Sequence, residues 1–486
     1  MYLGIDIGTS GVKAVIVDEV GHVRDSAHAG LDIQRPQPLW SEQTPADWWE
    51  ATNEAVMSLE GKSRSGVSAI GLTGQMHGAV VLGADGRALR PAILWNDGRS
   101  AAECRIFERD VPDLRDITGN RAMPGFTAPK LLWLKTHEPD VFAKITKILL
   151  PKDYIRLRMI GEYASDVSDS AGTLWLNVKQ RNWSEKILEA CGLSTDHMPG
   201  LFEGPDVTGE LRSELAEIWG MERIPVVAGG GDNAAGAIAS GVVHKGEGFL
   251  SLGTSGVIFL ADDGYRPNPE GGVHTFCHAL PGRWHQMSVM LSAASAVDWV
   301  AGICGFADPA ELYESVSGTA RLSDQEIFLP YLSGERTPHN DPAAQGVFFG
   351  LSHRTDKTRM GQAALEGVAF GLADGIRALR DTGADIKALS VTGGGAHSDY
   401  WGKILASSFN IPLIYRDNAA VGPAFGAARL ARLGTAGETV EDICKPPPIS
   451  NIIEPDAVFR NHLAPRLERF RTLYTRLADT FRENQI

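Results

Sequence analysis

A chain of 486 residues, of which 43% are hydrophobic, is long enough to bury sizeable cores in two or three domains. It carries 46 basic and 60 acidic residues and a net charge of −14, without any lysine- or arginine-rich run, which argues against a nucleic-acid partner. The five cysteines are scattered and lack metal-site spacing, which predicts a reducing compartment and no zinc site. The sequence shows no signal-peptide pattern and no apolar run of about 18 residues, so we expect a cytoplasmic protein without a membrane span.

The chain opens with three predicted strands in residues 1–35, and a turn rich in glycine and hydroxyl residues joins the first two. This stretch, Gly4–Lys13, reads GIDIGTSGVK. Such a turn directs backbone N–H groups and hydroxyls to one point, which suits a phosphate. Asp6 precedes the turn, and a phosphate repels a carboxylate unless a cation lies between them. Asp6 is therefore interpreted as a ligand on the Mg²⁺ side, acting through water; a turn aspartate bonded to its own backbone is the alternative.

A polar cluster follows the predicted strand Val67–Thr73, in the sequence GQMHG. Ligands of open α/β sheets usually bind at the carboxyl ends of strands. Gln75 and His77 can exchange hydrogen bonds with hydroxyl groups, and Met76 offers an apolar wall. This pattern favours a sugar site, with a surface-loop histidine as the alternative.

The next buried strand, Pro91–Trp95, leads into a second polar group. Asp97 either caps the following helix or binds a sugar hydroxyl while Arg99 holds it. Further along, helices are predicted to open near Thr127, a plausible cap, and near Lys152. The segment 165–173 is expected to be a turn-rich loop whose polar side chains, Asp166, Ser168 and Asp169, are solvated.

A second anchor follows the strand Ile224–Ala228. Three glycines, Gly229–Gly231, precede Asp232, and a helix of small residues runs to about Gly241. Asp232 alone fits a helix N-cap, but a cap needs no glycine triplet. An exposed, reactive carboxylate is therefore favoured. A dinucleotide fingerprint also matches loosely, but it would place a negative charge inside a pyrophosphate turn.

The second half repeats the first motif about half the chain later. Phe249–Val257 reads FLSLGTSGV and again predicts strand, turn and strand, with Ser251 where the first copy has Asp6. Two such turns indicate one polyphosphate held between two lobes, divided as 1–245 and 246–486. Glu335 and Arg336 are predicted to pair in a polar loop. Glycines follow the strand Ala388–Thr392, and they would let a purine lie on the backbone.

Taken together, these motifs resemble the FGGY family of carbohydrate kinases, within the actin/hexokinase/Hsp70-like superfamily. The resemblance covers nearly the whole chain and is carried by GIDIGTSGVK, QMHG, LWNDGR, GFTAPKLLWLKTH, GGGDNAAG, FLSLGTSGV, LPYLSGERTPH and SVTGGGAHS, in this chain order. It implies an α/β protein of two ribonuclease-H-like lobes, each a mixed sheet flanked by helices, with a sugar-binding N-terminal lobe, an ATP-binding C-terminal lobe and a cleft between them.

The resemblance also implies an activity: transfer of the γ-phosphoryl group of Mg-ATP to the 5-hydroxyl of D-xylulose, in pentose catabolism. Asp232 matches the catalytic base and Asp6 the acidic residue near the metal. The remaining matches are sugar-binding positions (Met76, His77, Asp232 and Asn233) and nucleotide-binding positions (Gly8, Thr9, Ser10, Lys13, Gly253, Thr254, Gly393, Gly394 and Gly395). A homodimer is compatible with the sequence.

Three alternatives remain at this point. A related kinase would act on ribulose, xylitol or a similar polyol. A nucleotide-switched binding protein of the Hsp70-like kind would need a peptide-binding domain after the ATPase, and only about 50 residues follow Gly434, fewer than a domain usually has. A nicotinamide-dependent oxidoreductase would bind NAD.

Overall fold

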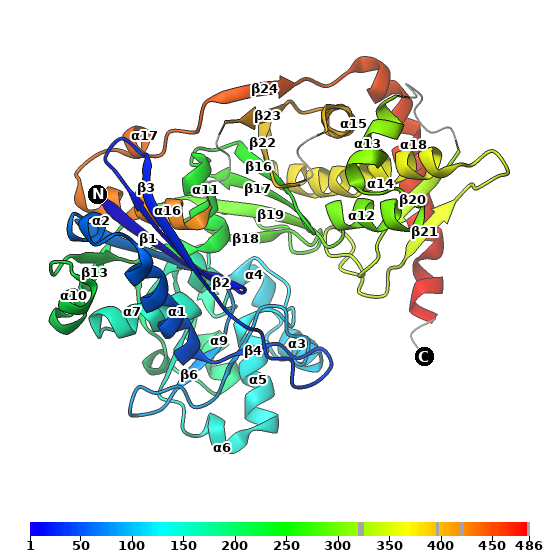
Figure 1. Cartoon of the computed structure of the whole chain (residues 1–486). Helices are drawn as coiled ribbons and strands as arrows, with labels where there is room; N and C mark the ends of the chain where they lie inside the picture. Colours follow the sequence, from blue (N-terminus) through cyan, green and yellow to red (C-terminus); the bar gives the residue numbers. More distant parts are fainter. Residues whose placement is uncertain (319–324, 395–397, 418–421, 484–486) are drawn as a thin grey trace.

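The computed structural model describes residues 1–318, 325–394, 398–417 and 422–483, and each half of the chain builds one large sheet (Figure 1). The N-terminal sheet consists of β1 (Tyr2–Ile7), β2 (Gly11–Val17), β3 (Val23–Gly30), β5 (Ala69–Gly74), β13 (Val207–Glu210), β14 (Pro225–Val227) and β15 (Gly230–Gly231). Its strands follow the order β13-β14-β5-β1-β2-β3, and the short strand β15, which is not part of this path, also pairs with β5.

The C-terminal sheet repeats the central part of this plan. It consists of β16 (Glu247–Leu252), β17 (Gly256–Asp262), β18 (His274–Cys277), β19 (Trp284–Met290), β22 (Ala388–Thr392), β23 (Leu413–Arg416) and β24 (Ile449–Ile453), in the order β18-β19-β17-β16-β22-β23-β24. In both sheets the first strand of the repeat is antiparallel to the second and parallel to a later strand, β5 or β22. The mixed sheets and the two predicted strand-turn-strand units are therefore confirmed.

Helices flank both sheets. The principal ones are α1 (Pro45–Ser58), α3 (Ala101–Asp110), α5 (Thr127–His137), α7 (Pro151–Ile160), α10 (Ser213–Trp219), α11 (Asp232–Ser240), α12 (Ala294–Ile303), α13 (Pro309–Ser317), α14 (Lys357–Arg380), α15 (Asp399–Phe409), α16 (Pro423–Thr435) and α18 (Ala457–Glu483). Among the described residues, none of the helices combines the length and the apolar character that crossing a bilayer requires. The five cysteines are free thiols.

The two copies of the GTSG turn differ in one respect that their identical sequences do not show. In the first, the N–H of Gly8 donates to the carbonyl of Gly11 at 3.0 Å. In the second, the N–H of Gly253 donates to the carbonyl of Ser255 at 3.1 Å, so this hairpin is one residue tighter.

Helix α16 belongs to the C-terminal half, yet it packs on the N-terminal sheet, against β1, β5 and α11 (Figure 1). Glycines make this approach possible. A Cβ atom at Gly4 would lie 1.8 Å from the carbonyl oxygen of Ala424, and one at Gly71 would lie 1.9 Å from that of Ala427. Gly426 likewise lets α16 rest on α11, because its Cβ would lie 1.8 Å from the carbonyl oxygen of Ala235. The two halves are thereby interlocked.

The prediction of a solvated loop at residues 165–173 is wrong. The segment forms β9 (Ala164–Asp166) and the short helix α8 (Val167–Ala171), and its polar side chains are fully buried. Asp166 caps α8 by accepting hydrogen bonds from the N–H groups of Ser168 and Asp169. Burial is possible because the ammonium group of Lys152 lies 2.7 Å from Asp166 and supplies the opposite charge.

We expect Gly71→Ala to destabilise the fold by about 3 kcal/mol, because the new methyl group must push α16 away from β5. The matched control is Gly30→Ala in β3, where an added Cβ would meet nothing within 4 Å. Chemical denaturation of both variants and the parent measures the difference. Equal stability of the two variants would show that the close packing of α16 is not required.

Candidate active site

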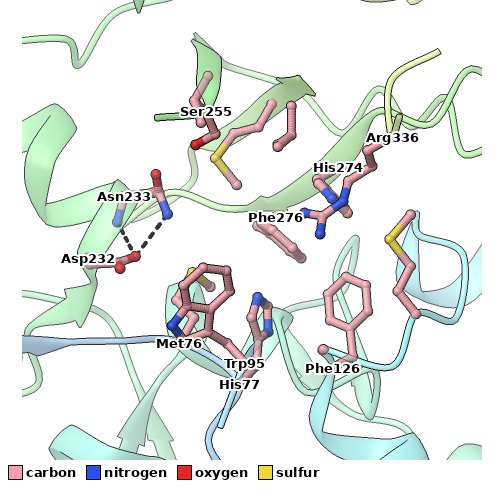
Figure 2. Close-up of a pocket in the computed structure, with 15 residues that line it drawn as sticks. Met76, His77, Trp95, Phe126, Asp232, Asn233, Ser255, His274, Phe276 and Arg336 are labelled. Atoms are coloured by element: carbon pink, nitrogen blue, oxygen red, sulfur yellow. Dashed lines mark hydrogen bonds between the residues drawn. The ribbon is translucent and has the colours of Figure 1, made fainter. Parts of the chain in front are cut away.

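A cavity of about 270 Å³ lies where the two halves meet (Figure 2). The N-terminal half contributes Met76, His77, Trp95, Met123, Gly125, Phe126, Asp232 and Asn233, and the C-terminal half contributes Ser255, Val257, His274, Phe276, Met287, Val289 and Arg336. In Figure 2, Asp232 lies at one end and Arg336 at the other, with aromatic and sulfur-containing side chains between them. Such a space, apolar with a few polar groups at its ends, fits a small polar molecule that is held in one orientation.

Asp232 is the first residue of α11, directly after β15, and the N-cap is Gly231. Its Oδ1 accepts hydrogen bonds from the backbone N–H of Asn233 at 2.7 Å and from Asn233 Nδ2 at 2.8 Å. Burial raises the pKa of Asp232 to about 6, and these two hydrogen bonds oppose that rise. The residue is therefore not the N-cap that the sequence allowed. It is a carboxylate that ionises close to neutral pH, as a general base requires.

Asp6 lies near the end of β1, close enough to Asp232 for the charge of one to affect the other. Its Oδ1 is buried and has no hydrogen-bond partner among the residues that the structure describes. Burial and the charge of Asp232 raise the pKa of Asp6 to about 7, while Lys13, its partner on β2, lowers it. No described backbone group bonds to its side chain, so the alternative of a self-bonded turn aspartate does not hold. Two carboxylates that repel each other in this way favour a cation or a proton nearby.

The first turn is tied to the strand ends around it through Thr9. The indole N–H of Trp95 donates to Thr9 Oγ1 at 3.0 Å, and Thr9 Oγ1 donates to Gln75 Oε1 at 3.0 Å. The amide of Gln43 donates to the Thr9 carbonyl at 2.7 Å. Sequence reasoning placed Gln75 at the sugar, but its amide supports the turn. It missed Gln43 and Trp95, although Trp95 directly precedes the NDGR motif.

His77 lines the cavity with its backbone in the left-handed region, at φ 69°. Its Nδ1 lies 2.6 Å from the carbonyl oxygen of Gly172, and a carbonyl can only accept, so Nδ1 carries the proton. Burial lowers the pKa of His77 to about 3, which keeps the ring neutral and leaves Nε2 as an acceptor. The His77 carbonyl accepts from Lys130 Nζ and from Thr127 Oγ1, so Thr127 holds this turn and does not cap α5.

Asp97 lies outside the cavity lining and takes neither predicted role. It is buried, where its Oδ2 accepts from the N–H of Ser41 at 2.6 Å and pairs with Arg99 at 2.7 Å. The guanidinium of Arg99 also lies 3.6 Å from the ring centre of Trp40. The N-cap of α3 is Ser100. This group therefore supports the fold next to the site.

The prediction of a Glu335–Arg336 ion pair is also wrong. Glu335 Oε1 accepts from the backbone N–H groups of Leu291 and Arg336. The guanidinium of Arg336 instead lines the cavity beside His274, and it has no hydrogen bond or ion pair to any residue that the structure describes (Figure 2). Sequence reasoning missed Arg336 as a site residue, because nothing near it in sequence indicates which way the side chain points.

A wider hollow of about 710 Å³ lies on the C-terminal half, bordered by Tyr313, Gly394, Ser398, Tyr400 and Lys403 among others. Gly393, at the end of β22, has φ 95°, and a Cβ there would lie 2.4 Å from the Leu252 carbonyl at the end of β16. The predicted positions Gly393 and Gly394 thus lie beside the second turn and this hollow, while Gly395 falls outside the described residues.

The described residues contain no cluster of three or more histidine, cysteine or acidic side chains that could hold a metal ion. This does not argue against Mg²⁺, which usually keeps several waters and binds one or two carboxylates together with substrate phosphates. The unpartnered Oδ1 of Asp6 is a donor of the kind that such an ion prefers.

Comparisons with known proteins agree over both halves. Residues 1–239 match the N-terminal domain model, and residues 248–434 the C-terminal domain model, of the FGGY family of carbohydrate kinases. A xylulose kinase from Escherichia coli is 51% identical over 98% of this chain and 99% of its own length, and one from Klebsiella pneumoniae is 50% identical over the same shares. The crystal structure of a xyloylose kinase from Brucella ovis has a TM-score of 0.96 at 47% identity and covers 99% of both chains.

We expect the value of kcat/KM to fall tenfold per pH unit below pH about 6. Burial raises the pKa of Asp232 by disfavouring its charged form, and a base works only when it is ionised, so activity is lost as the pH falls through this value. Steady-state rates from pH 4.5 to 8.5, at fixed ionic strength, measure the profile. A profile that stays flat down to pH 4 would contradict the assignment of Asp232 as a buried base.

Proposed function

We propose that this chain, which belongs to the FGGY family of carbohydrate kinases, transfers the γ-phosphoryl group of ATP to the 5-hydroxyl of D-xylulose, forming D-xylulose 5-phosphate. The observation that carries the proposal is the placement of Asp232 at one end of a sugar-sized cavity, with Ser255 of the second GTSG turn lining that cavity. Relatives that are about half identical over nearly the whole chain are xylulose kinases, which supports the choice of sugar.

In the reaction that we propose, the 5-hydroxyl oxygen attacks the γ-phosphorus while Asp232 accepts the hydroxyl proton. The bond from phosphorus to the β-phosphate oxygen breaks, and ADP leaves. His77, neutral and with Nδ1 bound to Gly172, accepts a hydrogen bond from another sugar hydroxyl through Nε2. Met76 and Asn233 border the same space. Positioning in a site that excludes water supplies most of the rate enhancement and limits transfer to water.

Mg²⁺ is proposed to lie on the Asp6 side of the site. The fit rests on the buried Oδ1 of Asp6, which has no hydrogen-bond partner among the described residues, and on the negative charge of Asp232, which acts on Asp6. When bound, the ion neutralises charge on the phosphate oxygens. The chain itself contributes the first turn, Gly8, Thr9 and Ser10, with Lys13 opposite Asp6, as the proposed phosphate-binding side.

The nucleotide is proposed to bind the C-terminal lobe. Gly253 and Thr254 are placed to donate hydrogen bonds to phosphates, and the glycines from Gly393 to Gly395 to support the adenosine. The wider hollow bordered by Gly394 supports this assignment. The lobe boundary at residue 245, a cytoplasmic location and a homodimer remain predictions.

Among the alternatives, an Hsp70-like binding protein and a nicotinamide-dependent oxidoreductase are excluded by family membership. A related sugar kinase is the closer competitor, because a gluconate kinase structure from Lactobacillus acidophilus has a TM-score of 0.93 at 25% identity. The higher identity to xylulose kinases favours D-xylulose over another ketose or polyol.

We expect Asp232→Ala to lower kcat by about 10²- to 10⁴-fold, the usual contribution of a general base, with unchanged ATP affinity. Coupled ADP-release assays and calorimetric ATP titration give the two quantities. Asp47→Ala is the matched control, because Asp47 is an exposed acid in the first turn of α1. Unchanged turnover of Asp232→Ala would exclude it as the base.

We expect a kcat/KM for D-xylulose at least tenfold above that for D-ribulose, L-ribulose, xylitol, glycerol or gluconate. The reason is that the polar groups at the two ends of the cavity fit one arrangement of hydroxyl and carbonyl groups. ADP release with each sugar at equal ATP measures the preference. A better rate with another member of the panel would move the assignment to that sugar.

A further inference from the structure

A fully buried cluster of charged side chains lies next to the segment that carries Asp232. Lys152 Nζ lies 2.6 Å from Asp153 Oδ1, 2.7 Å from Asp166 Oδ1 and 3.3 Å from Asp169 Oδ2. Arg156 pairs with Asp153 at 2.7 Å. None of these residues is more than 1% exposed. Two cations and three carboxylates are therefore held together out of contact with water.

Two hydrogen bonds join this cluster to the junction between β14 and α11. The Arg156 guanidinium donates to the carbonyl of Ala228, and the N–H of Gly231 donates to Ser168 Oγ at 3.2 Å. The two bonds hold both ends of the stretch Gly229–Gly231. A glycine stretch has more conformational freedom than any other, and these two bonds add to the pairing of β15 with β5 in holding it in place.

Ser168 connects the junction to the charges. Its hydroxyl donates to Asp166 Oδ2, and Asp166 Oδ1 is paired with Lys152. The hydroxyl hydrogen is thus committed to Asp166, which leaves the oxygen lone pairs for the N–H of Gly231. A chain of polar contacts thus links the buried ammonium group of Lys152, through Asp166 and Ser168, to Gly231, the residue immediately before Asp232.

The same short segment holds the sugar side of the cavity. The carbonyl of Gly172, which follows α8, accepts the hydrogen bond from His77 Nδ1. A Cβ at Gly172 would lie 2.6 Å from the His77 ring and 3.0 Å from Met76 Cε, so the two surfaces are already in close contact. The segment from β9 to Gly172 therefore contacts His77 directly and the residue before Asp232 through Ser168. His77 and Asp232 are the two polar side chains that we assign to the acceptor sugar.

We infer that Ser168 is a positioning residue for phosphoryl transfer: its hydroxyl, fixed by Asp166 and Lys152, sets the place of Gly231 and thereby of the Asp232 carboxylate. This inference rests on the proposed function and adds to it the element that aligns the base. It also explains why such a cluster is kept beside the site. Buried ion pairs add little net stability compared with apolar packing, whereas a base displaced by about 1 Å loses much of its rate.

The charge of the cluster is compatible with this role. Burial, and then the charges of Asp166, Asp153 and Asp232, raise the pKa of Asp169 well above its usual value, against the opposing effect of Lys152. Asp169 thus holds a proton more tightly than a free aspartate does, which lessens the excess of negative charge in a cluster of two cations and three carboxylates.

The experiment compares Ser168→Ala with Ser170→Ala. Ser170 is equally buried in α8, but among the residues that the structure describes its hydroxyl bonds only to Ser165 Oγ, at 2.9 Å, and not to the backbone of Gly231. We expect Ser168→Ala to lower kcat by about 10- to 100-fold with a change in KM for D-xylulose of less than about threefold, because the base is displaced and the sugar contacts remain. Ser170→Ala is expected to keep kcat within about twofold. Hydrogen exchange of residues 224–234 should accelerate in Ser168→Ala alone.

Equal kcat values and equal exchange rates in the two variants would overturn the inference. If Ser168→Ala does not fold, Ser168→Cys, which keeps the side-chain size with weaker hydrogen bonding, replaces it in the same comparison. A parent enzyme that does not phosphorylate D-xylulose would contradict the proposed function. In that case, the exchange of residues 224–234 in the two variants decides the inference by itself.

Discussion

The proposed reaction depends on one constraint: the carboxylate of Asp232 must ionise near neutral pH in surroundings that disfavour its charge. Burial raises its pKa to about 6, and the two donors of Asn233 limit that rise. Its place at the start of α11 adds the favourable field of a helix N-terminus. A buried acid with this balance can take a proton from a sugar hydroxyl and release it again.

The site needs both halves of the chain, so their relative placement matters as much as any side chain. Asp232 belongs to the first half, whereas Ser255 and Arg336, which line the same cavity, belong to the second. Helix α16 fixes this placement, because it lies directly on β1 and β5, where glycines allow contact between backbones. One helix of the C-terminal half is thus packed against the N-terminal sheet.

The sequence alone allowed correct predictions where the local pattern of residues determines the local structure. The repeated GTSGV predicted two hairpins in equivalent sheets, and the stretch around Asp232 predicted that this residue lies where a strand gives way to a helix, as it does between β15 and α11. It was insufficient where a distant partner decides. The second turn is one residue tighter, and the N–H groups of Ala293 and Ala294 donate to the carbonyls of Thr254 and Gly253, a contact that the motif does not contain.

The same reasoning explains the errors at residues 165–173 and at Arg336. Their polarity argued for solvent, but the cost of burying a charge depends on what neutralises it, and that is a property of the fold. Asp166 is neutralised by Lys152 and is part of the structure. The guanidinium of Arg336 lines the cavity without a hydrogen bond or ion pair to any described residue, and Asp6 Oδ1 has no hydrogen-bond partner among them. Whether a buried polar group is neutralised is thus decided by residues that are distant in the sequence, and the local pattern does not contain them.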